Sequence, residues 1–465
     1  MRVIIAANRA PLRRTPAGWE PAVGGLSTAL LPVLEREGGV WIASMEQTGL
    51  PERHGYPEGD LAFEVRRLAL SQDELENYYN GMSNSVIWPI SHYMLQHLEP
   101  RGAYADAYRK VNGRFAQAVV DELREGDLVW VHDYHLMAVP ALVRDARPEA
   151  AIGYFWHIPW PAVEVYRIVP GARALLRGML GSDLIGFHID EYVGNFLECA
   201  RRLLGAEVRG GRILWQGREV RVESHPIGID VRMFERMSEE GAAEAEAFRR
   251  ELGGEYVVVG IDRLDYTKGV LSRLLAFERL LRENPDLCGR VTLFQVATPS
   301  RSVVESYQQL KREVDEAVGR INGAFARDRW VPIHYRYRSY TQRELCVFYR
   351  AADVALITPL RDGMNLVTQE FIASTQSGVL VLSELTGAAH VLPEALGVNP
   401  YDEDSLVAAL ERALRMPREE RLARLRRLKE RVADLDVHPW AAGFLRAMRG
   451  AAAASPTAAE KPIAR

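Results

Sequence analysis

Short runs of aliphatic and β-branched residues alternate with longer amphipathic segments along most of the chain. The short runs predict buried strands, at 3–7, 128–131, 152–155 and 184–187 in the first half and at 256–261, 291–296, 354–357 and 379–382 in the second. Apolar residues at helical spacing predict helices between them, for example at 104–123, 270–282 and 302–321. Strands that alternate with helices are typical of parallel sheets covered on both faces. The predicted fold class is therefore α/β with doubly wound sheets.

Two stretches interrupt this alternation. Residues 210–222 resemble a small hairpin. The sequence at 226–230, followed by a polar stretch rich in Glu and Ala, predicts a hinge between two doubly wound halves. The predicted domains are thus 1–228 and 229–450, facing a central cleft that suits a reaction between two bound molecules; packing of the last helix back onto the first domain is an alternative. Residues 451–465, rich in Ala, Ser and Pro, are predicted to be disordered.

Length, composition and charge are those of an ordinary globular protein. At 465 residues the chain exceeds what one hydrophobic core usually supports, which favours two domains. With 26% charged residues and a net charge of -4, it has no general attraction to nucleic acid or acidic membranes. The apolar run after Arg2 is too short for a signal peptide or a membrane span. The three cysteines show no metal-ligand spacing and are predicted to be buried, reduced thiols of a cytoplasmic protein: Cys199, Cys288 and Cys346.

The most informative segment is the turn between the strand at 354–357 and a helix predicted at 366–374. This turn carries Arg361, Asp362, Gly363 and Asn365. In open α/β sheets ligands bind at this edge, and free amides at a helix N-terminus suit a phosphate or a developing oxyanion. Glu370, about one helical turn further on, can accept hydrogen bonds from hydroxyl groups. The structural alternative is a plain Asp-Gly turn in which Asp caps the helix.

A second turn of the same kind lies at 260–269. It follows the first strand of the second half and precedes a helix, so Arg263 and Lys268 are expected at the same strand-end crevice as Asp362. Two cations beside a helix N-terminus make a site for a diphosphate. The structural alternative is a basic pair on the surface.

In the first half, polar residues also stand where strands end. The candidates are Arg9 after the first strand, Gly24 and Gly25 in a flexible loop before a helix, Tyr79 and Trp88 in an irregular segment, and Asp133 and His157 at the ends of two strands. Strand ends are the functional edge of such sheets, whereas the structural alternative is an aromatic core with a buried histidine. No spacing indicates a metal site, no Walker loop is present, and no cofactor is expected.

Taken in order, these motifs resemble the retaining trehalose-6-phosphate synthase family of glycosyltransferases, from about residue 2 to residue 446. The resemblance implies a GT-B fold of two Rossmann-like domains, the first binding the acceptor and the second the nucleotide-sugar donor. It implies a hexosyltransferase that moves glucose from a nucleotide diphosphate glucose, with UDP-glucose as the first choice, to glucose 6-phosphate. The product would be trehalose 6-phosphate, made with retention and without a metal.

The resemblance also implies residue roles. The catalytic set would be His157, Asp362, Arg263 and Lys268, with the two cations neutralising the leaving diphosphate and His157 contacting the donor sugar near its 6-hydroxyl. The remaining donor contacts would come from the backbone amides of Gly363, Met364, Asn365 and Leu366, from Glu370 on the ribose, and from a closing loop with Gly24 and Gly25. The acceptor phosphate would lie among Arg9, Tyr79, Trp88 and Arg301, and the acceptor sugar against Trp41 and Asp133.

The chemistry fits these roles. Negative charge grows on the departing diphosphate during glycosyl transfer, and fixed cations and amides stabilise charge where it develops. The resemblance indicates a front-face route in which the leaving phosphate deprotonates the acceptor hydroxyl, so no pair of glycosidase-type carboxylates is needed.

Two departures from the family leave substrate preference open. Ala43-Ser-Met45 stands where members often continue Gly-Trp-Ser, and Gln369 stands where Lys often precedes the ribose-binding Glu. The alternatives are a glucosylglycerol-phosphate synthase that uses glycerol 3-phosphate, a pseudo-glycosyltransferase and, outside the enzymes, an inactive regulatory paralogue. No nucleic acid or membrane partner is expected, and a homo-oligomer stays open.

Overall fold

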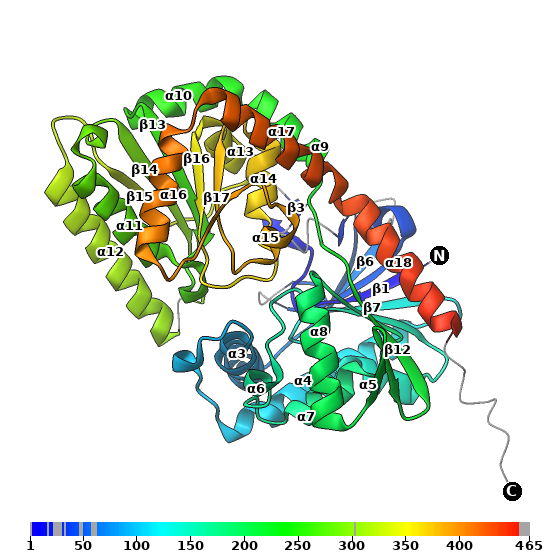
Figure 1. Ribbon diagram of the computed structural model, residues 1–465. Helices are drawn as coiled ribbons and strands as arrows, with labels where there is room; N and C mark the ends of the chain where they lie inside the picture. Colours follow the sequence, from blue (N-terminus) through cyan, green and yellow to red (C-terminus); the bar gives the residue numbers. More distant parts are fainter. Residues whose placement is uncertain are drawn as a thin grey trace, which may run out of the picture. The chain divides into compact units, whose positions relative to one another are not determined.

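The computed structural model describes residues 2–15, 18–21, 30–31, 34–45, 50–56, 63–301 and 304–454. The chain divides into two compact units, Met1–Ile227 with His438–Arg465, and Gly228–Val437. Strands alternate with helices in both units (Figure 1). The domain boundaries and domain roles predicted from the sequence stay predictions.

Within its described residues, the first unit contains a ten-stranded sheet in the order β10-β11-β12-β9-β8-β7-β1-β4-β6-β5. The parallel strands are β1 (Val3–Ala6), β4 (Gly39–Ser44), β6 (Phe63–Leu68), β7 (Leu128–His132), β8 (Ala151–Phe155), β9 (Leu184–Phe187) and β12 (Arg218–Ser224). The antiparallel additions are β5 (Arg53–Tyr56), β10 (Glu207–Arg209) and β11 (Arg212–Trp215), and β2 (Leu12–Thr15) pairs separately with β3 (Gly18–Pro21). The predicted strands and the predicted hairpin are confirmed, whereas β4, β5 and β6 were not predicted.

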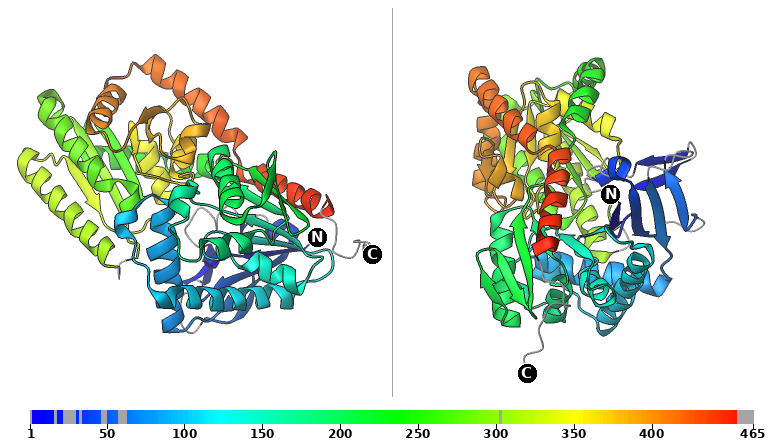
Figure 2. Two further views of the ribbon diagram at one scale, coloured as in Figure 1. Left: turned by 60° about the horizontal axis from the view of Figure 1, so that its bottom comes forward. Right: turned by 90° about the vertical axis from the view of Figure 1, so that its right-hand side faces the viewer.

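Helices cover both faces of this sheet. On one face α4 (Gly102–Glu122) contacts α5 (Val139–Ala146), which contacts α7 (Ala172–Met179). On the other face α18 (Val437–Ala454) stacks Phe444 on Trp130 of β7, with ring centroids 4.8 Å apart. Figure 2 shows α18 in red beside the green hairpin strands.

The C-terminal prediction is partly wrong. Residues 451–454 continue α18, because a run of alanines is the best helix former and Ala451 is buried. The rest of the predicted disordered tail lies outside the described residues.

The segment predicted to be irregular around Tyr79 and Trp88 is helical. Ser71 and Glu74 form a capping box that starts α2 (Gln72–Glu74), which continues as the π-helix η1 (Leu75–Ile87) and α3 (Trp88–Ser91). The polar, glycine-containing composition favours loops, but burial of apolar side chains against α4 overrides that preference.

The second unit contains, within its described residues, a six-stranded parallel sheet in the order β15-β14-β13-β16-β17-β18. Its strands are β13 (Tyr256–Arg263), β14 (Val291–Thr298), β15 (Ile333–Arg336), β16 (Val354–Ile357), β17 (Val379–Ser383) and β18 (Leu396–Val398). One face packs into a hydrophobic core with α11 (Val270–Glu283), α12 (Glu305–Phe325) and α16 (Glu403–Arg415). The other carries α9 (Val231–Glu240), α10 (Ala242–Leu252), α13 (Gln342–Ala351), α14 (Val367–Ser374) and α17 (Arg418–Asp434) (Figure 1). The predicted doubly wound arrangement is confirmed in this unit.

The cysteines and the helices bear on two further predictions. All three cysteines are free thiols; Cys199 and Cys346 are buried, but Cys288 is partly exposed, contrary to the prediction. Among the helices that the structure describes, none is both long and apolar enough to cross a membrane.

Candidate active site

The predicted site residues form two sets, one in each unit. The first unit holds Arg9, Trp41, Tyr79, Trp88, Asp133 and His157, and the second holds Arg263, Lys268, Arg301, Asp362, Gly363, Met364, Asn365, Leu366 and Glu370. Gly24 and Gly25 lie outside the described residues.

In the second unit, Asp362 is fixed by three hydrogen-bond donors. Lys268 Nζ lies 2.5 Å from Asp362 Oδ2, and Asn365 Nδ2 donates to the same oxygen at 2.9 Å. The backbone amide of Gly363 donates to Oδ1 at 2.9 Å. The ammonium and carboxylate side chains are only 10% and 15% exposed, so solvent screens their attraction poorly. The structure therefore brings Lys268 and Asp362 together, from the ends of β13 and β16.

The two turns that carry these residues interlock. The amide of Leu360 donates to the carbonyl of Thr267 at 2.7 Å. Gly269 has φ +63°, and a Cβ there would overlap the carbonyl oxygen of Thr358. Beneath them the fully buried Arg273 donates to Thr358 Oγ1 at 3.3 Å and to Asp262 Oδ2 at 2.7 Å. Each turn thus fixes the position of the other.

The turn after β16 presents free backbone amides. Asn365 adopts a left-handed conformation with φ 72°, which a non-glycine residue reaches only at a cost. No side chain caps α14. The amides of Met364, Asn365 and Leu366 donate to no acceptor among the residues that the structure describes. Amides at a helix N-terminus are a binding site for an anion.

Glu370 lies within the first turn of α14. Tyr349 Oη donates to its Oε2 at 2.9 Å. Burial raises the pKa of Glu370 to about 7, although the bond from Tyr349 opposes the shift. Its Oε1 accepts no hydrogen bond from the described residues, so it is available to a ligand hydroxyl.

A buried carboxylate that the sequence did not single out organises the basic residues. Asp265 Oδ2 lies 3.1 Å from Arg301 Nη1 and accepts from Tyr307 Oη at 3.0 Å. Burial alone would raise its pKa, but the charges of Arg301, Arg263 and Lys268 outweigh burial and lower the pKa to about 2. Asp265 is therefore, with Asp362, a negative charge that stabilises three cations in one small region. Its one sequence signal is the Asp-x-Thr spacing of a local cap.

In the first unit, Arg9, Trp41 and Tyr79 are brought together. Arg9 Nη2 donates to Tyr79 Oη at 3.2 Å, and Trp41 Nε1 donates to the Arg9 carbonyl at 2.9 Å. Tyr79 stacks on His135, with ring centroids 5.7 Å apart. Trp88 is buried and lies elsewhere on the same helical segment, against His92 and Tyr134.

Asp133 and His157 lie at the ends of the neighbouring strands β7 and β8. Asp133 is left-handed, with φ 70°, and its carbonyl accepts from Tyr154 Oη at 2.6 Å. The amide of His157 points to Asp133 Oδ1 at 3.4 Å. His157 Nε2 lies 3.0 Å from Nδ1 of His132, a residue that the sequence did not single out. Burial, reinforced by His132 and His188, holds the pKa of His157 well below its usual value, so its imidazole is neutral at pH 7.

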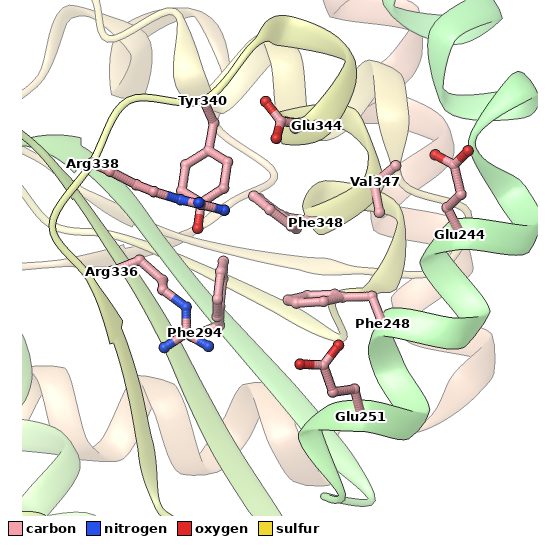
Figure 3. Close-up of a pocket in the computed structure, with 10 residues that line it drawn as sticks. All are labelled: Glu244, Phe248, Glu251, Phe294, Arg336, Arg338, Tyr340, Glu344, Val347 and Phe348. Carbon is pink, nitrogen blue, oxygen red and sulfur yellow. The ribbon is translucent and has the colours of Figure 1, made fainter.

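A separate cavity of about 290 Å³ lies in the second unit, between α10, β14, β15 and α13 (Figure 3). It is lined by Glu244, Phe248, Glu251, Phe294, Arg336, Arg338, Tyr340, Glu344, Val347 and Phe348, and none of these is a predicted site residue. Glu344 is engaged in capping α13, and Glu244 pairs with Arg343. Its charges are of both signs and converge on no common point in Figure 3, so the cavity adds nothing to the candidate site.

The parallel sheets and the match to solved trehalose-phosphate synthases define a class, the glycosyltransferases of GT-B fold. Within that class, the chain belongs to glycosyltransferase family 20, whose profile matches residues 1–449. The predicted fold class, enzyme class and family resemblance are confirmed by these findings.

Two curated relatives and one solved structure give the extent of the similarity. The chain is 44% identical over 461 residues to a bifunctional trehalose-6-phosphate synthase/phosphatase of Thermoproteus tenax, covering 96% of this chain but only 63% of the relative. It is 40% identical to a trehalose-6-phosphate synthase of Mycobacterium avium, covering 96% of this chain and 94% of the relative. The crystal structure of an α,α-trehalose-phosphate synthase (UDP-forming) from Burkholderia xenovorans, in complex with glucose-6-phosphate, matches with a TM-score of 0.90 and 34% identity, over 97% of this chain and 100% of that one.

Proposed function

We propose that this chain transfers glucose from UDP-glucose to glucose 6-phosphate, forming trehalose 6-phosphate with retention of the anomeric configuration. The observation that carries the proposal is the pairing of Lys268 with Asp362 beside the free amides that begin α14. The Burkholderia xenovorans protein, named as UDP-forming and bound to glucose-6-phosphate, supports this choice of donor and acceptor. The free thiols support a cytoplasmic location.

The second unit would bind the donor. Lys268 and Arg263 neutralise the diphosphate. Asp362, held by the amide of Gly363, and the free amides of 364–366 hold the donor glucose and its phosphates. The Glu370 carboxylate accepts hydrogen bonds from both hydroxyl groups of the ribose. The interlocked turns make this arrangement rigid before the substrate arrives, so the charges need no reorganisation during the reaction.

The first unit would bind the acceptor. Arg9, Tyr79 and Trp88 surround its phosphate, and Trp41 and Asp133 contact its sugar. Two further contacts belong to the proposal: Arg301 binds the acceptor phosphate, and His157 contacts the 6-hydroxyl of the donor glucose.

The proposed chemistry is a metal-independent front-face transfer. The bond from the anomeric carbon to the diphosphate breaks, and negative charge develops on the departing phosphate oxygen. Lys268 and Arg263 stabilise that charge. The same phosphate oxygen takes the proton of the acceptor hydroxyl, whose oxygen forms the new bond on the face that the diphosphate leaves.

A matrix of donors and acceptors tests this function. Purified protein is incubated with UDP-, ADP-, GDP- or TDP-glucose, each with glucose 6-phosphate or glycerol 3-phosphate, and release of nucleoside diphosphate is measured. We expect release only with glucose 6-phosphate and fastest with UDP-glucose. Equal turnover with glycerol 3-phosphate would identify the alternative synthase, and no release in any combination would favour the inactive paralogue.

The raised pKa of Glu370 gives a pH-dependent prediction. A ribose diol donates both of its hydrogens and therefore binds the ionised carboxylate, which is lost as the pH falls through about 7. We expect the KM for UDP-glucose to rise about tenfold between pH 8 and pH 6. The Glu370→Gln variant should have a high KM that no longer changes over this range; retention of the wild-type slope would show that another group titrates.

A further inference from the structure

The strongest unexplained arrangement in the molecule is the buried contact between two histidine rings in the first unit. His132 ends β7 and is fully buried, whereas His157, two residues after β8, keeps part of its surface exposed. In the sheet, His132 lies beside Phe155 in register, so the strand geometry itself brings the two rings together. The rings stack with centroids 5.3 Å apart, and His132 Nδ1 lies 3.0 Å from His157 Nε2.

Both rings are neutral at pH 7, so one ring must donate the hydrogen bond and the other must accept it. Burial lowers the pKa of His132 to about 3 and, with the neighbouring histidines, lowers the pKa of His157 well below its usual range. A neutral imidazole has one N–H donor and one acceptor nitrogen. Either His132 Nδ1 donates to His157 Nε2, or His157 Nε2 donates to His132 Nδ1.

The surroundings of the other nitrogens choose between these two arrangements. His132 Nε2 is buried and has no hydrogen-bond partner within the described part of the chain. If it carried the proton, it would be a buried N–H without an acceptor, which is unfavourable and uncommon in native structures. The proton of His132 therefore belongs on Nδ1, where it is donated to His157.

We propose that His132 is a positioning residue that fixes His157 as the tautomer protonated on Nδ1. His157 then presents a permanent N–H donor on its partly exposed side, where its Nδ1 makes no hydrogen bond to the described residues. His188 helps to hold the backbone of His157 in place. Its Nε2 lies 3.2 Å from the His157 carbonyl oxygen, which can only accept, so His188 is the donor.

This assignment deepens the proposed function and rests on it for its substrate consequence. A fixed N–H donor requires a lone pair on the sugar group that it meets. Such an N–H can donate to a hydroxyl or ether oxygen, but not to a charged ammonium group, which has only hydrogens to donate. The transferred sugar would thus be selected for an oxygen at this position, and a 6-amino-6-deoxy donor, cationic at pH 7, would be a poor substrate.

Nitrogen-15 NMR of the full chain with labelled histidine reads the tautomer without requiring turnover. We expect His157 of the wild type to be protonated on Nδ1 and, in His132→Leu, to shift towards protonation on Nε2. The His132→Asn variant, whose side-chain amide can occupy the place of Nδ1–H, should keep the wild-type tautomer. With UDP-glucose, His132→Leu should lower kcat/KM by about tenfold, the value of one lost hydrogen bond, and His132→Asn should recover part of this loss.

The outcomes separate this inference from the proposed function. Protonation of wild-type His157 on Nε2, or an unchanged tautomer in His132→Leu, would overturn the inference whether or not the protein turns over. Absence of turnover with every donor and acceptor would remove the proposed function and leave the NMR result standing. The His334→Leu variant, which removes a partly buried histidine of the second unit, should leave both the His157 signals and turnover unchanged. If His132→Leu does not fold, the wild-type and His132→Asn spectra still decide the question.

Discussion

Replacement of Lys268 by Met is expected to lower kcat/KM with UDP-glucose and glucose 6-phosphate by about a thousandfold. Two effects combine. The leaving diphosphate loses a fixed cation where its charge develops, and the carboxylate of Asp362, 15% exposed, loses the ammonium 2.5 Å away. Steady-state kinetics with both substrates varied measures the loss, and single-turnover experiments assign it to the chemical step.

A double variant separates these effects. In Lys268→Met/Asp362→Asn the uncompensated carboxylate is gone, so any further loss relative to Asp362→Asn alone reflects the missing contact with the diphosphate. We expect the double variant to turn over far more slowly than Asp362→Asn; equal turnover of the two would mean that Lys268 only neutralises Asp362 and would contradict its contact with the diphosphate. Lys311→Met is the matched control, because it removes a 36%-exposed lysine whose i,i+4 partner is Asp315. It should leave kcat/KM within about twofold of the wild type, as expected for an exposed pair.

Replacement of Gly269 by Ala is expected to reduce both stability and activity. The residue has φ +63°, which disfavours any side chain, and the added methyl group would overlap the carbonyl oxygen of Thr358. Left-handed strain and overpacking together should lower the free energy of unfolding by about 2–4 kcal/mol. Because the clash pushes apart the turns that carry Lys268 and Asp362, turnover should fall by about a hundredfold.

Gly253→Ala is the matched control for this variant. Gly253 ends α10 at φ +71°, but a Cβ there would meet nothing within 4 Å. The Gly253→Ala substitution should therefore lower the free energy of unfolding by about 1–2 kcal/mol through backbone strain alone and leave turnover unchanged. Urea unfolding and steady-state kinetics on the two variants measure the difference. Equal stability losses, or normal turnover in Gly269→Ala, would contradict the proposal that the interlocked turns position the donor site.

The local parts of the fold could be read from the sequence. Buried strands of parallel sheets are continuous apolar runs, so β13 (Tyr256–Arg263) and β16 (Val354–Ile357) stand out against the turns that follow them. The segment from Leu75 to Ile87 could not be read in this way. Its glycine and asparagines favour a loop, and only packing against α4 keeps it helical.

Some residues of the candidate site could be predicted from the sequence and others could not. Lys268 and Asp362 were predictable, because charged and turn-forming residues directly after an apolar strand are visible in sequence and share one sheet edge by topology. Asp265, His132 and Tyr349 were not, since nothing in the sequence shows which partner a buried polar residue meets; the Asp-x-Thr spacing at Asp265 indicates only a local cap.

The sequence by itself determined the α/β class, the family and the turns that carry the candidate site residues, because each depends on residues adjacent in the chain. The tertiary structure alone decided how those residues are held. It paired Lys268 with Asp362 across 94 positions, placed Asp265 among its cations, and brought His132 to His157. Hydrogen bonds and ion pairs act over a few ångströms, so the side chains that they join are chosen by the packing of strands far apart in sequence.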